Sequence, residues 1–276
     1  MRPQWWRAVS AAGLTVAVVL GVWSIALEPD HLFVNPLRVR VPGAPAGLKV
    51  VVLADVHGGA PHVSAAKLRK VVGVVNGLEP DVVVFLGDLV IHGVVGGRFM
   101  DPEPAARELG AMTPRLGKVA VLGNHDWWLD GPRVRRALEA GGFRVLENDV
   151  TSVDRGGVRL WFAGLADLWT RQPDIEGTLA KIPAGEPLVL LTHNPDLFPN
   201  VPARVALTLA GHTHGGQVRI PLLGPPIVPS AFGQRYAAGM IEEDGRRMFV
   251  TTGIGTSILP VRFRVPPEIA VITLED

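Results

Sequence analysis

The chain has 276 residues, with 27 basic and 26 acidic side chains, a net charge of +1 and no cysteine. A nearly neutral chain lacks the general attraction to phosphate backbones on which nucleic-acid-binding proteins depend, so no nucleic-acid partner is expected. The absence of cysteine excludes disulfide bonds and thiolate metal ligands. About 245 residues remain after the first thirty, which is enough for one large α/β core.

The first predicted element is an apolar helix near the N-terminus. Residues 8–27 contain no charged side chain, and at 1.5 Å per residue they span about 30 Å, the hydrocarbon thickness of a bilayer. Tryptophans lie near both ends of the stretch, as in the aromatic belts of membrane helices: Trp5, Trp6 and Trp23. We predict a single-pass membrane anchor. A cleaved signal peptide is the alternative, because Ser24-Ile25-Ala26 offers a small-x-small cleavage site.

The charges that flank this helix predict its orientation. Arg2 and Arg7 precede the apolar stretch, whereas Glu28 and Asp30 follow it. Because positively charged flanks stay on the cytoplasmic side, the rest of the chain is expected on the outer side of the membrane. The chain is therefore predicted to have three parts: an anchor or signal peptide at 1–30, a linker with the first strand at 31–47, and one large domain at 48–276.

Five short polar clusters in the large domain each follow an apolar run that is typical of a buried strand. The runs cover residues 48–54, 81–86, 118–122, 188–191 and 205–210. The clusters are, in the same order, Asp55-Val56-His57, Gly87-Asp88, Gly123-Asn124-His125-Asp126, Thr192-His193 and Gly211-His212-Thr213-His214. Because ligands of open α/β sheets bind beyond the carboxyl ends of the strands, we expect these clusters to meet at one rim.

The side chains in these clusters are the donors that a pair of divalent cations needs. Imidazole, carboxylate and amide oxygen without sulfur suit manganese, iron or zinc, whereas magnesium prefers nearly all oxygen. Two such ions roughly 3.5–4 Å apart can clamp a phosphoryl group and hold a bridging hydroxide for in-line attack. Each cluster alone is typical of a turn or of a hydrogen-bonded structural histidine. The ordered set predicts a two-metal centre that hydrolyses phosphate esters.

The order of the five clusters resembles that of the calcineurin-like metallophosphoesterases. The resemblance covers about residues 48–274, and its most specific part is Gly211-His212-Thr213-His214-Gly215-Gly216-Gln217. The tail at 252–269 resembles one branch, the single-span membrane-associated bacterial phosphoesterases. That branch includes enzymes similar to the pyrophosphatase that acts on UDP-2,3-diacylglucosamine in lipid A biosynthesis. The resemblance implies an α/β fold in which two packed mixed β-sheets are flanked by helices, a four-layer α-β-β-α arrangement, behind an N-terminal transmembrane helix.

The resemblance also implies a role for each of eight side chains. One metal ion would be held by Asp55, His57 and His214, and the other by Asn124, His193 and His212. Asp88 would bridge the two ions. The catalytic residues would be Asp88 and His125, of which His125 is not a ligand and assists the leaving group as a general acid or transition-state stabiliser.

One position departs from the family pattern. At the motif that begins with Gly87-Asp88, many members have Gly-Asp-x-x-Asp, whereas this chain has Ile91 at the last position. The missing carboxylate is not expected to be a metal ligand, so the departure puts a contact outside the ligand set in doubt. His92 could replace that contact in part, but a surface histidine in a glycine-rich loop is the simpler interpretation.

These observations predict a hydrolase that cleaves a phosphodiester or pyrophosphate bond, in a substrate linked to the membrane that the anchor crosses. Its place would be the bacterial inner membrane, with the catalytic domain on the periplasmic or cell-surface side. Two alternatives stay open. One is a UDP-2,3-diacylglucosamine hydrolase of lipid A biosynthesis, whose substrate is made on the cytoplasmic face, and the other is a non-catalytic metal-binding scaffold. The presence of His125 and Asp88 favours catalysis over the scaffold.

The remaining segments are interpreted as framework. Apolar periodicity predicts helices at 64–78, 103–112 and 132–140, antiparallel strands within 143–165, and further strands within 218–274. A Pro- and Gly-rich loop at 221–229 should lie near the site, with 231–236 shaping the pocket. Trp127 and Trp128 could stack on substrate or pack in the core. The basic runs at 133–136 and 262–264 are interpreted as solvated faces.

Overall fold

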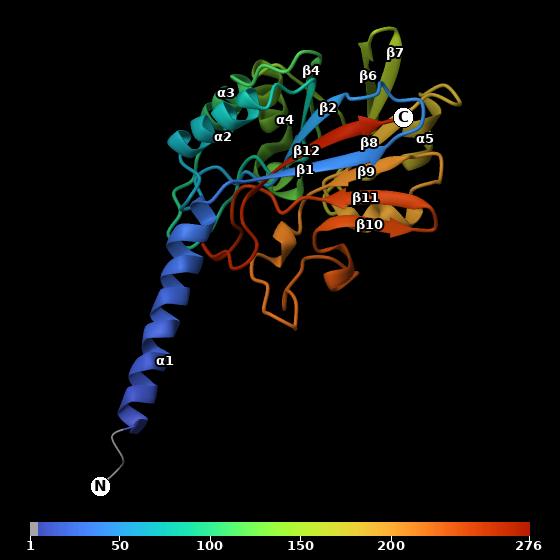
Figure 1. Cartoon of the computed structure of the whole chain (residues 1–276). Helices are drawn as coiled ribbons and strands as arrows, with labels where there is room; N and C mark the ends of the chain where they lie inside the picture. Colours follow the sequence, from blue (N-terminus) through green and yellow to red (C-terminus); the bar gives the residue numbers. More distant parts are fainter. Residues whose placement is uncertain (1–4) are drawn as a thin grey trace.

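A long N-terminal helix stands away from a domain built of two stacked β-sheets (Figure 1). The computed structural model describes the backbone of residues 5–276 and the side chains from residue 9 onward. Arg2 lies outside the described residues, and Trp5, Trp6 and Arg7 lie outside the described side chains. Their predicted places at the membrane surface therefore stay predictions.

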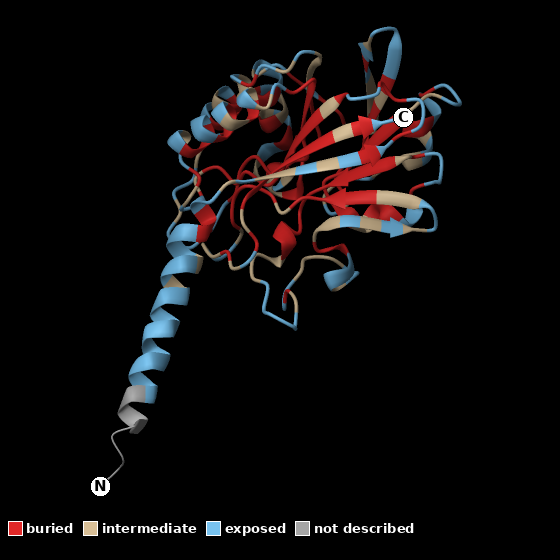
Figure 2. Ribbon diagram, in the orientation of Figure 1, coloured by how far each residue is buried: buried red, intermediate tan, exposed pale blue. Residues whose placement is uncertain are grey.

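From Val9 to Leu27 nearly every residue of the N-terminal helix is exposed (Figure 2). α1 covers Trp5–Val22 and continues through a π-helical turn at Trp23–Leu27 into a 3₁₀ turn at Glu28–Asp30. By length and composition, Val9–Asp30 is the one helical segment of the described chain that is apolar enough to cross a membrane, and no part of its apolar window is buried. An apolar helix without a protein partner is typical of a membrane span.

The first sheet carries three of the five polar clusters. Its strand order is β1-β12-β2-β3-β4-β5, in which β2 to β5 run parallel and β12 is antiparallel to β2. The strands are β1 (Phe33–Arg40), β2 (Lys49–Leu53), β3 (Val82–Phe85), β4 (Gly117–Ala120), β5 (Phe143–Val145) and β12 (Glu268–Glu275).

The second sheet carries the other two clusters. Its order is β10-β11-β9-β8-β7-β6, with a parallel centre and an antiparallel strand at each edge. The strands are β6 (Asp149–Arg155), β7 (Val158–Gly164), β8 (Leu188–Leu191), β9 (Leu207–Ala210), β10 (Gly239–Glu243) and β11 (Arg246–Val250).

Alternation along the central strands explains why the sheets form the middle of four layers. Val50 and Val52 of β2 face the second sheet, in a core shared with Leu207 and Leu209 of β9. Val51, between them, faces the helices that cover the first sheet. Those helices are α2 (Ala65–Gly77), α3 (Pro102–Gly110) and α4 (Asn124–Ala140), and α5 (Ile175–Ala180) with a 3₁₀ turn at Pro195–Asn200 covers the second sheet.

The four-layer fold confirms the predicted fold class, and one helix differs from its predicted bounds. We predicted a helix at 132–140, but α4 begins at Asn124 and is broken at Asp130, which has non-helical angles (φ −173°, ψ 87°). Pro132 follows this break, at the start of the second segment, where its missing N–H removes no hydrogen bond. The extra first segment places Asn124 and His125 on the first turn of a helix.

Candidate metal centre

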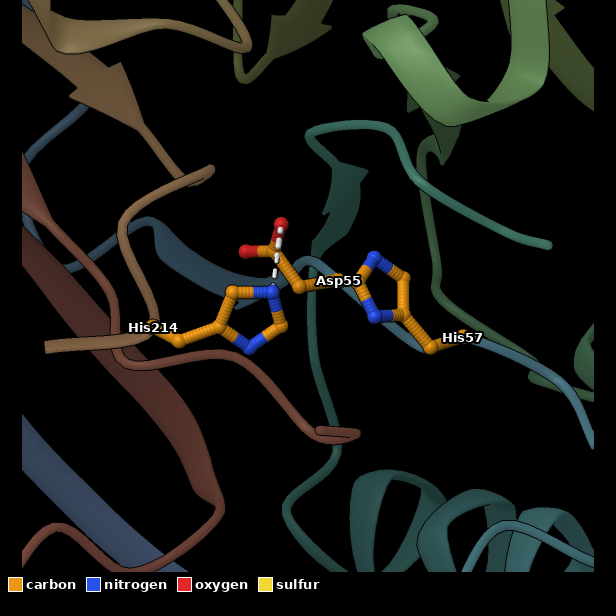
Figure 3. Close-up of side chains that lie close together, drawn as sticks. All are labelled: Asp55, His57 and His214. Carbon is orange, nitrogen blue, oxygen red and sulfur yellow. Dashed lines mark ion pairs between the residues drawn. The ribbon is translucent and has the colours of Figure 1, made fainter. Parts of the chain in front are cut away.

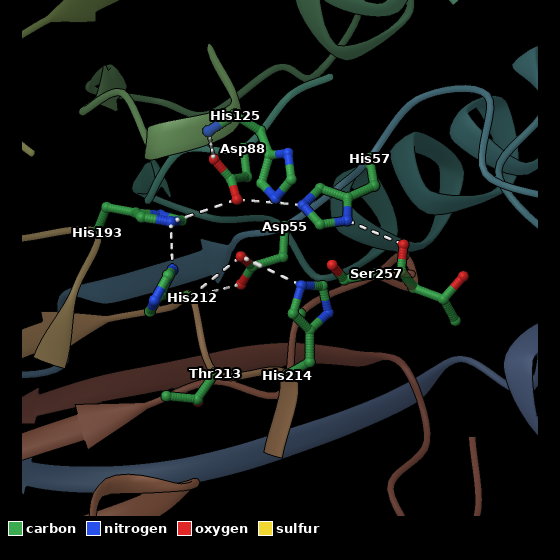
Figure 4. A network of polar contacts seen from close by, with 12 residues as sticks. Asp55, His57, Asp88, His125, His193, His212, Thr213, His214 and Ser257 are labelled. Atoms are coloured by element: carbon green, nitrogen blue, oxygen red, sulfur yellow. Dashed lines mark hydrogen bonds and ion pairs between the residues drawn. The ribbon is translucent and has the colours of Figure 1, made fainter. Parts of the chain in front are cut away.

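The five polar clusters meet between the carboxyl ends of the two sheets (Figure 4). Three clusters follow β2, β3 and β4 of the first sheet, and two follow β8 and β9 of the second. The sheets are joined at this edge by the His193 ring, whose Nδ1 lies 2.8 Å from the carbonyl oxygen of Leu86. The prediction that the clusters meet at one edge of the sheets is therefore confirmed.

Left-handed backbone is concentrated in these clusters. Positive φ angles between 49° and 72° occur at Asp55, His57, Asp88, His212 and His214. Such angles are uncommon in residues other than glycine, and they occur often at functional sites. Here they turn toward one another side chains that would point in different directions from a regular strand. Gly123 is needed for a different reason, because a Cβ there would collide with the Asp88 carboxylate and the His193 ring.

One group of donors, here called the first cluster, consists of Asp55, His57 and His214 (Figure 3). All three side chains are buried. Their donor atoms lie within 4.8 Å of one another, and His214 Nε2 is 3.7 Å from Asp55 Oδ1. The Asp55 carboxylate also accepts a hydrogen bond from the backbone N–H of His212, which ties it to the neighbouring strand end.

The second cluster consists of Asp88, Asn124, His193 and His212, and all four residues are buried. Its centre is His193 Nε2, which lies 3.1 Å from Asn124 Oδ1, 3.1 Å from His212 Nδ1 and 3.3 Å from Asp88 Oδ2. Asp88 Oδ2 also lies 3.1 Å from His57 Nε2. The Asp88 carboxylate therefore stands between the two clusters.

Hydrogen bonds to backbone carbonyls decide which ring nitrogens face the centre with a lone pair. His57 Nδ1 lies 2.9 Å from the carbonyl oxygen of Thr256, which can only accept, so this nitrogen carries the proton. The same holds for His193 Nδ1 against Leu86. When these rings are neutral, their Nε2 lone pairs point at the carboxylate oxygen of Asp88 and the amide oxygen of Asn124, which also only accept. Acceptors gathered in this way fit a bound cation.

Two further ring nitrogens fit the same conclusion. His212 Nε2 and His214 Nδ1 are buried and have no hydrogen-bond partner among the described residues. Burying a polar atom without a partner is unfavourable, so the folded chain already bears an electrostatic cost in this region. The donor set therefore fits divalent cations, and the Asp88 carboxylate approaches rings of both clusters.

Burial and the neighbouring carboxylates also shift the pKa values of the side chains in both clusters. Burial lowers the pKa of His193, but the Asp88 carboxylate outweighs this effect and raises it to about 10. Burial raises the pKa of Asp55 to about 6, and burial lowers the pKa of His212 to about 3. Negative charge shared by Asp55 and Asp88 thus attracts positive charge, which a proton supplies when no metal ion does.

His125 lies at the edge of this arrangement and is half-buried. Its backbone N–H donates to Asp88 Oδ1 at 3.0 Å, and its ring centroid is 5.0 Å from that of His57. Burial lowers the pKa of the ring to about 4, against an opposing effect of Asp88. One of its ring nitrogens lies within 4.8 Å of donor atoms of His57 and Asp88. The ring therefore borders both the clusters and the pocket.

A pocket of about 380 Å³ opens over both clusters. Exposed Trp128 and Trp169 line one part of it, with ring centroids 6.3 Å apart, and Trp169 stands edge-on to His212 at 4.3 Å. Ile227 and Ile258 line another part. The predicted loop at 221–229 does reach the pocket, but the prediction for 231–236 is wrong, because that segment does not line it.

The two adjacent tryptophans divide between the two roles that were open for them. Trp128 is exposed in the pocket and contacts His125 with a centroid distance of 4.7 Å. Trp127 packs against the core, and the Arg171 guanidinium lies 4.4 Å from its ring centre. Trp169 was missed in the sequence, because it follows no strand end and no motif includes it.

Comparison with known proteins gives the same result as the geometry. Residues 48–216 match the family model of the calcineurin-like phosphoesterases. An uncharacterized metallophosphoesterase of Bacillus subtilis is 33% identical over 275 residues, covering 98% of this chain and 94% of the relative. The chain belongs to the calcineurin-like phosphoesterase family.

Two further relatives have named activities. A phosphodiesterase of Escherichia coli is 29% identical and covers 83% of each chain. A UDP-2,3-diacylglucosamine pyrophosphatase of Chlamydia trachomatis is 25% identical and covers 94% of each. As a member of this family, the chain is a metal-dependent phosphoric ester hydrolase.

In this phosphoesterase, the side chain of Asp126 holds the loop that follows β3. The sequence indicated no role for this residue. Asp126 is buried, and it accepts hydrogen bonds from the backbone N–H groups of Asp88, Leu89 and Gly123 at 2.9 to 3.1 Å. It thereby fixes the backbone at Asp88 and the backbone next to Asn124, two residues of the second cluster. The available signal was its place in the first turn of a helix, where an acidic residue commonly binds free N–H groups.

The interpretation of residues 262–264 as a solvated face is wrong for Arg262. Its side chain is fully buried, and its guanidinium donates to the carbonyl oxygens of Thr252, Gly253, Gly255 and Val265. Burial lowers its pKa to about 10. Four carbonyls in one loop need donors that the loop itself does not supply, and the guanidinium satisfies them together.

The departure at Ile91 leaves the clusters intact. Ile91 is buried in the apolar core under the helices of the first sheet, and so it replaces a polar contact with packing. His92 is exposed and stacks on Phe99 with ring centroids 4.5 Å apart. The interpretation of His92 as a surface histidine is therefore confirmed, and it is not part of either cluster.

Proposed function

We propose that this phosphoesterase hydrolyses a phosphodiester or pyrophosphate bond with two divalent ions held at the first and second clusters. The observation that carries the proposal is the convergence of two buried imidazole Nε2 atoms on carboxylate and amide oxygens 3.1–3.3 Å away, while the Nδ1 atoms of the same rings bond to backbone carbonyls. When bound, two such ions supply an activated water and neutralise the charge that develops on the phosphoryl oxygens.

The ligand roles follow from the grouping of the donors. Asp55, His57 and His214 would hold one ion and Asn124, His193 and His212 the other. Asp88 would serve both ions, because its Oδ2 approaches rings from both clusters. His125, which lines the pocket beside Asp88, would assist the leaving group as a general acid or as a transition-state stabiliser. This donor set favours manganese, iron or zinc over magnesium.

The test is a screen of the purified full-length protein in detergent. Metal-free protein is reloaded with manganese, iron, zinc or magnesium and assayed on phosphomonoesters, phosphodiesters and nucleotide-linked lipids. We expect two ions per chain by elemental analysis and the highest turnover on a diester or pyrophosphate. Hydrolysis that needs no metal, or full activity with a single ion, would contradict the proposal.

The membrane location is a second part of the proposal. We infer that the apolar stretch at 8–27 crosses the bacterial inner membrane and that the domain lies on its outer side, because Arg2 and Arg7 precede the span, whereas Glu28 and Asp30 follow it. Alkaline phosphatase fused after Asp276 should then be active, and ordinary green fluorescent protein at the same place should be dark. A bright fluorescent fusion would put the site in the cytoplasm. Release of a chain shortened by about 26 residues would show cleavage of a signal peptide.

A second candidate function is cleavage of a UDP-linked acylated sugar. It is supported by the relative from Chlamydia trachomatis and by the exposed rings of Trp128 and Trp169, which can hold a nucleobase by stacking. A cytoplasmic domain in the fusion experiment would favour this candidate, because that substrate is made on the cytoplasmic face. Turnover of UDP-2,3-diacylglucosamine in the metal screen is the direct measurement.

A further inference from the structure

Two loops beside the pocket carry exposed apolar side chains. We define the apolar rim as Leu222, Leu223, Ile227, Ile258 and Leu259, whose exposed fractions lie between 52% and 106%. Ile227 and Ile258 belong to the pocket lining as well. An apolar group of this kind next to an active-site pocket marks a binding surface rather than ordinary surface variation.

The two rim loops form one unit with the end of the anchor. Val218 pairs with Phe263 in a parallel bridge, which joins the loops to each other. The backbone N–H of Arg262 donates to the carbonyl oxygen of Ser24 at 2.9 Å, and Glu28 accepts from the N–H of Val265. In Figure 1 both loops lie on the side of the sheets from which α1 leaves the domain.

These contacts set the rim at the depth of the membrane surface. Ser24 belongs to the apolar stretch that ends at Leu27, so its carbonyl lies within the last helical turn of that stretch. If the stretch occupies the hydrocarbon region, the loop bonded to Ser24 lies at the boundary of headgroups and acyl chains. Interfacial protein segments bury their apolar side chains about 5–10 Å deep at this boundary.

The charge next to the rim also fits a lipid surface. Arg219 and Arg264 are both exposed, and they line the same surface hollow as Leu222 and Leu223. Neither arginine has an ion-pair partner within the part of the chain that the structure describes. Apolar side chains that enter the bilayer beside arginines that reach headgroup phosphates are the usual pattern of interfacial segments.

Backbone conformation gives an independent indication. Leu222 and Ile258, both exposed members of the rim, have positive φ angles of 70° and 62°. Glycine adopts such angles without strain, whereas a β-branched residue does so rarely. Apolar side chains are thus presented to solvent at two places where glycine would relax the turn.

We propose that the apolar rim is a second membrane contact, which inserts into the same bilayer as α1 and sets the mouth of the pocket at the lipid surface. The proposal rests on the membrane anchor, and it defines the substrate class as a phosphoester with an apolar tail that enters from the membrane. The acyl chain would leave the pocket between Ile227 and Ile258, and the scissile phosphate would lie over the clusters.

The absence of cysteine from the chain allows a direct test in the full-length protein. An environment-sensitive fluorophore is attached to L222C, I258C or V158C in vesicles of phosphatidylcholine and phosphatidylglycerol. Val158 is the matched control, because it is an exposed apolar residue at the hairpin between β6 and β7. Doxyl-labelled lipids should quench the probes at 222 and 258 several-fold more than the probe at 158. Equal quenching at all three positions would overturn the proposal.

A second measurement separates this proposal from the proposed function. The variant Leu222→Ser with Leu223→Ser, which alters no pocket residue, should hydrolyse a water-soluble bis(nitrophenyl) phosphate at the rate of the unaltered protein. Its rate on a palmitoyl nitrophenyl phosphodiester embedded in the vesicles should fall by about tenfold or more, because two apolar anchors are lost. If the variant and the unaltered protein cleaved the embedded diester at equal rates, the proposed membrane contact of the apolar rim would be wrong. Failure of the unaltered protein to cleave either diester would overturn the phosphodiesterase part of the proposed function and leave the quenching result standing.

Discussion

The two clusters of the candidate centre are supported by buried side chains of opposite kind, an acidic group and a guanidinium. The second cluster is held by the Asp126 carboxylate, which gathers backbone N–H groups of residues 88–90 and 123. The first cluster depends on the loop at 252–256, whose carbonyls are gathered by the Arg262 guanidinium and whose Thr256 carbonyl orients the His57 ring. The oxygens of an aspartate accept from backbone N–H groups and a guanidinium donates to carbonyls, so each loop has the hydrogen-bonding partner that its free backbone groups require.

The two supports also differ in their connection to the N-terminal helix. Arg262 and Val265 are hydrogen-bonded to Ser24 and Glu28, so the support of the first cluster is continuous with the end of that helix. Trp23 and Lys67 reinforce that junction through Glu28 and Asp30. The support of the second cluster comes from within the domain. Disturbance of the anchor is therefore expected to affect the first cluster before the second.

The largest effect is expected where the two clusters share a residue. Asp88→Asn removes the one carboxylate that approaches both, since Asp88 Oδ2 lies near His57 and His193. Turnover should be abolished, and the metal content by elemental analysis should fall to one ion or fewer. Two tightly bound ions in this variant would show that the clusters do not share Asp88.

Replacement of His125 should separate catalysis from metal binding. His125→Ala is expected to keep both ions and to lose activity by roughly 10²–10⁴-fold, the usual contribution of acid–base catalysis. The loss should be smaller for substrates with a nitrophenol leaving group, which needs no protonation. An equal loss for good and poor leaving groups would argue against proton donation by His125. Loss of one ion would instead make it a ligand.

The smallest effects, and the most informative for the comparison, should come from the two supporting charges. Asp126→Asn should weaken one of the two metal-binding steps, and Arg262→Met the other, by about 10–100-fold, the usual effect of removing a residue that orients ligands. Titration calorimetry with manganese measures both steps. In a His214→Ala background, Arg262→Met should cause little further loss, whereas Asp126→Asn should still act, because only the former shares a cluster with His214.

Matched controls exist for both variants. Arg246 donates to the carbonyl oxygens of Phe198, Pro199 and Val201 away from the site, so Arg246→Met tests the loss of a carbonyl-binding guanidinium by itself. Asp81 is buried and accepts the N–H of Lys49 at the opposite end of the first sheet, so Asp81→Asn is the counterpart of Asp126→Asn. If the variants and the controls changed the metal affinity equally, Asp126 and Arg262 would contribute only to the general stability of the fold and not to the orientation of the ligands.

Much of the fold and of the candidate site could be predicted, because the signals are local. Each buried strand that precedes a cluster is an apolar run, and the polar residue that ends it, such as Asp55 or His193, is adjacent in the chain. The fold class followed from the family resemblance, and the helix at 64–78 from its apolar stripe. The bounds of α4 were predicted less well, because the break at Asp130 conceals that its first segment is helical.

The sequence by itself determined the polar clusters, the strands that carry them and the apolar segment that can cross a membrane. These features depend on residue types within a few positions of one another. Tertiary structure alone decided that Arg262 is buried, that Asp126 holds two loops, and that Trp128 and Trp169 share a pocket while Trp127 packs inside. A charge is buried only where partners from distant segments satisfy it, and those partners are brought together by the packing of the two sheets.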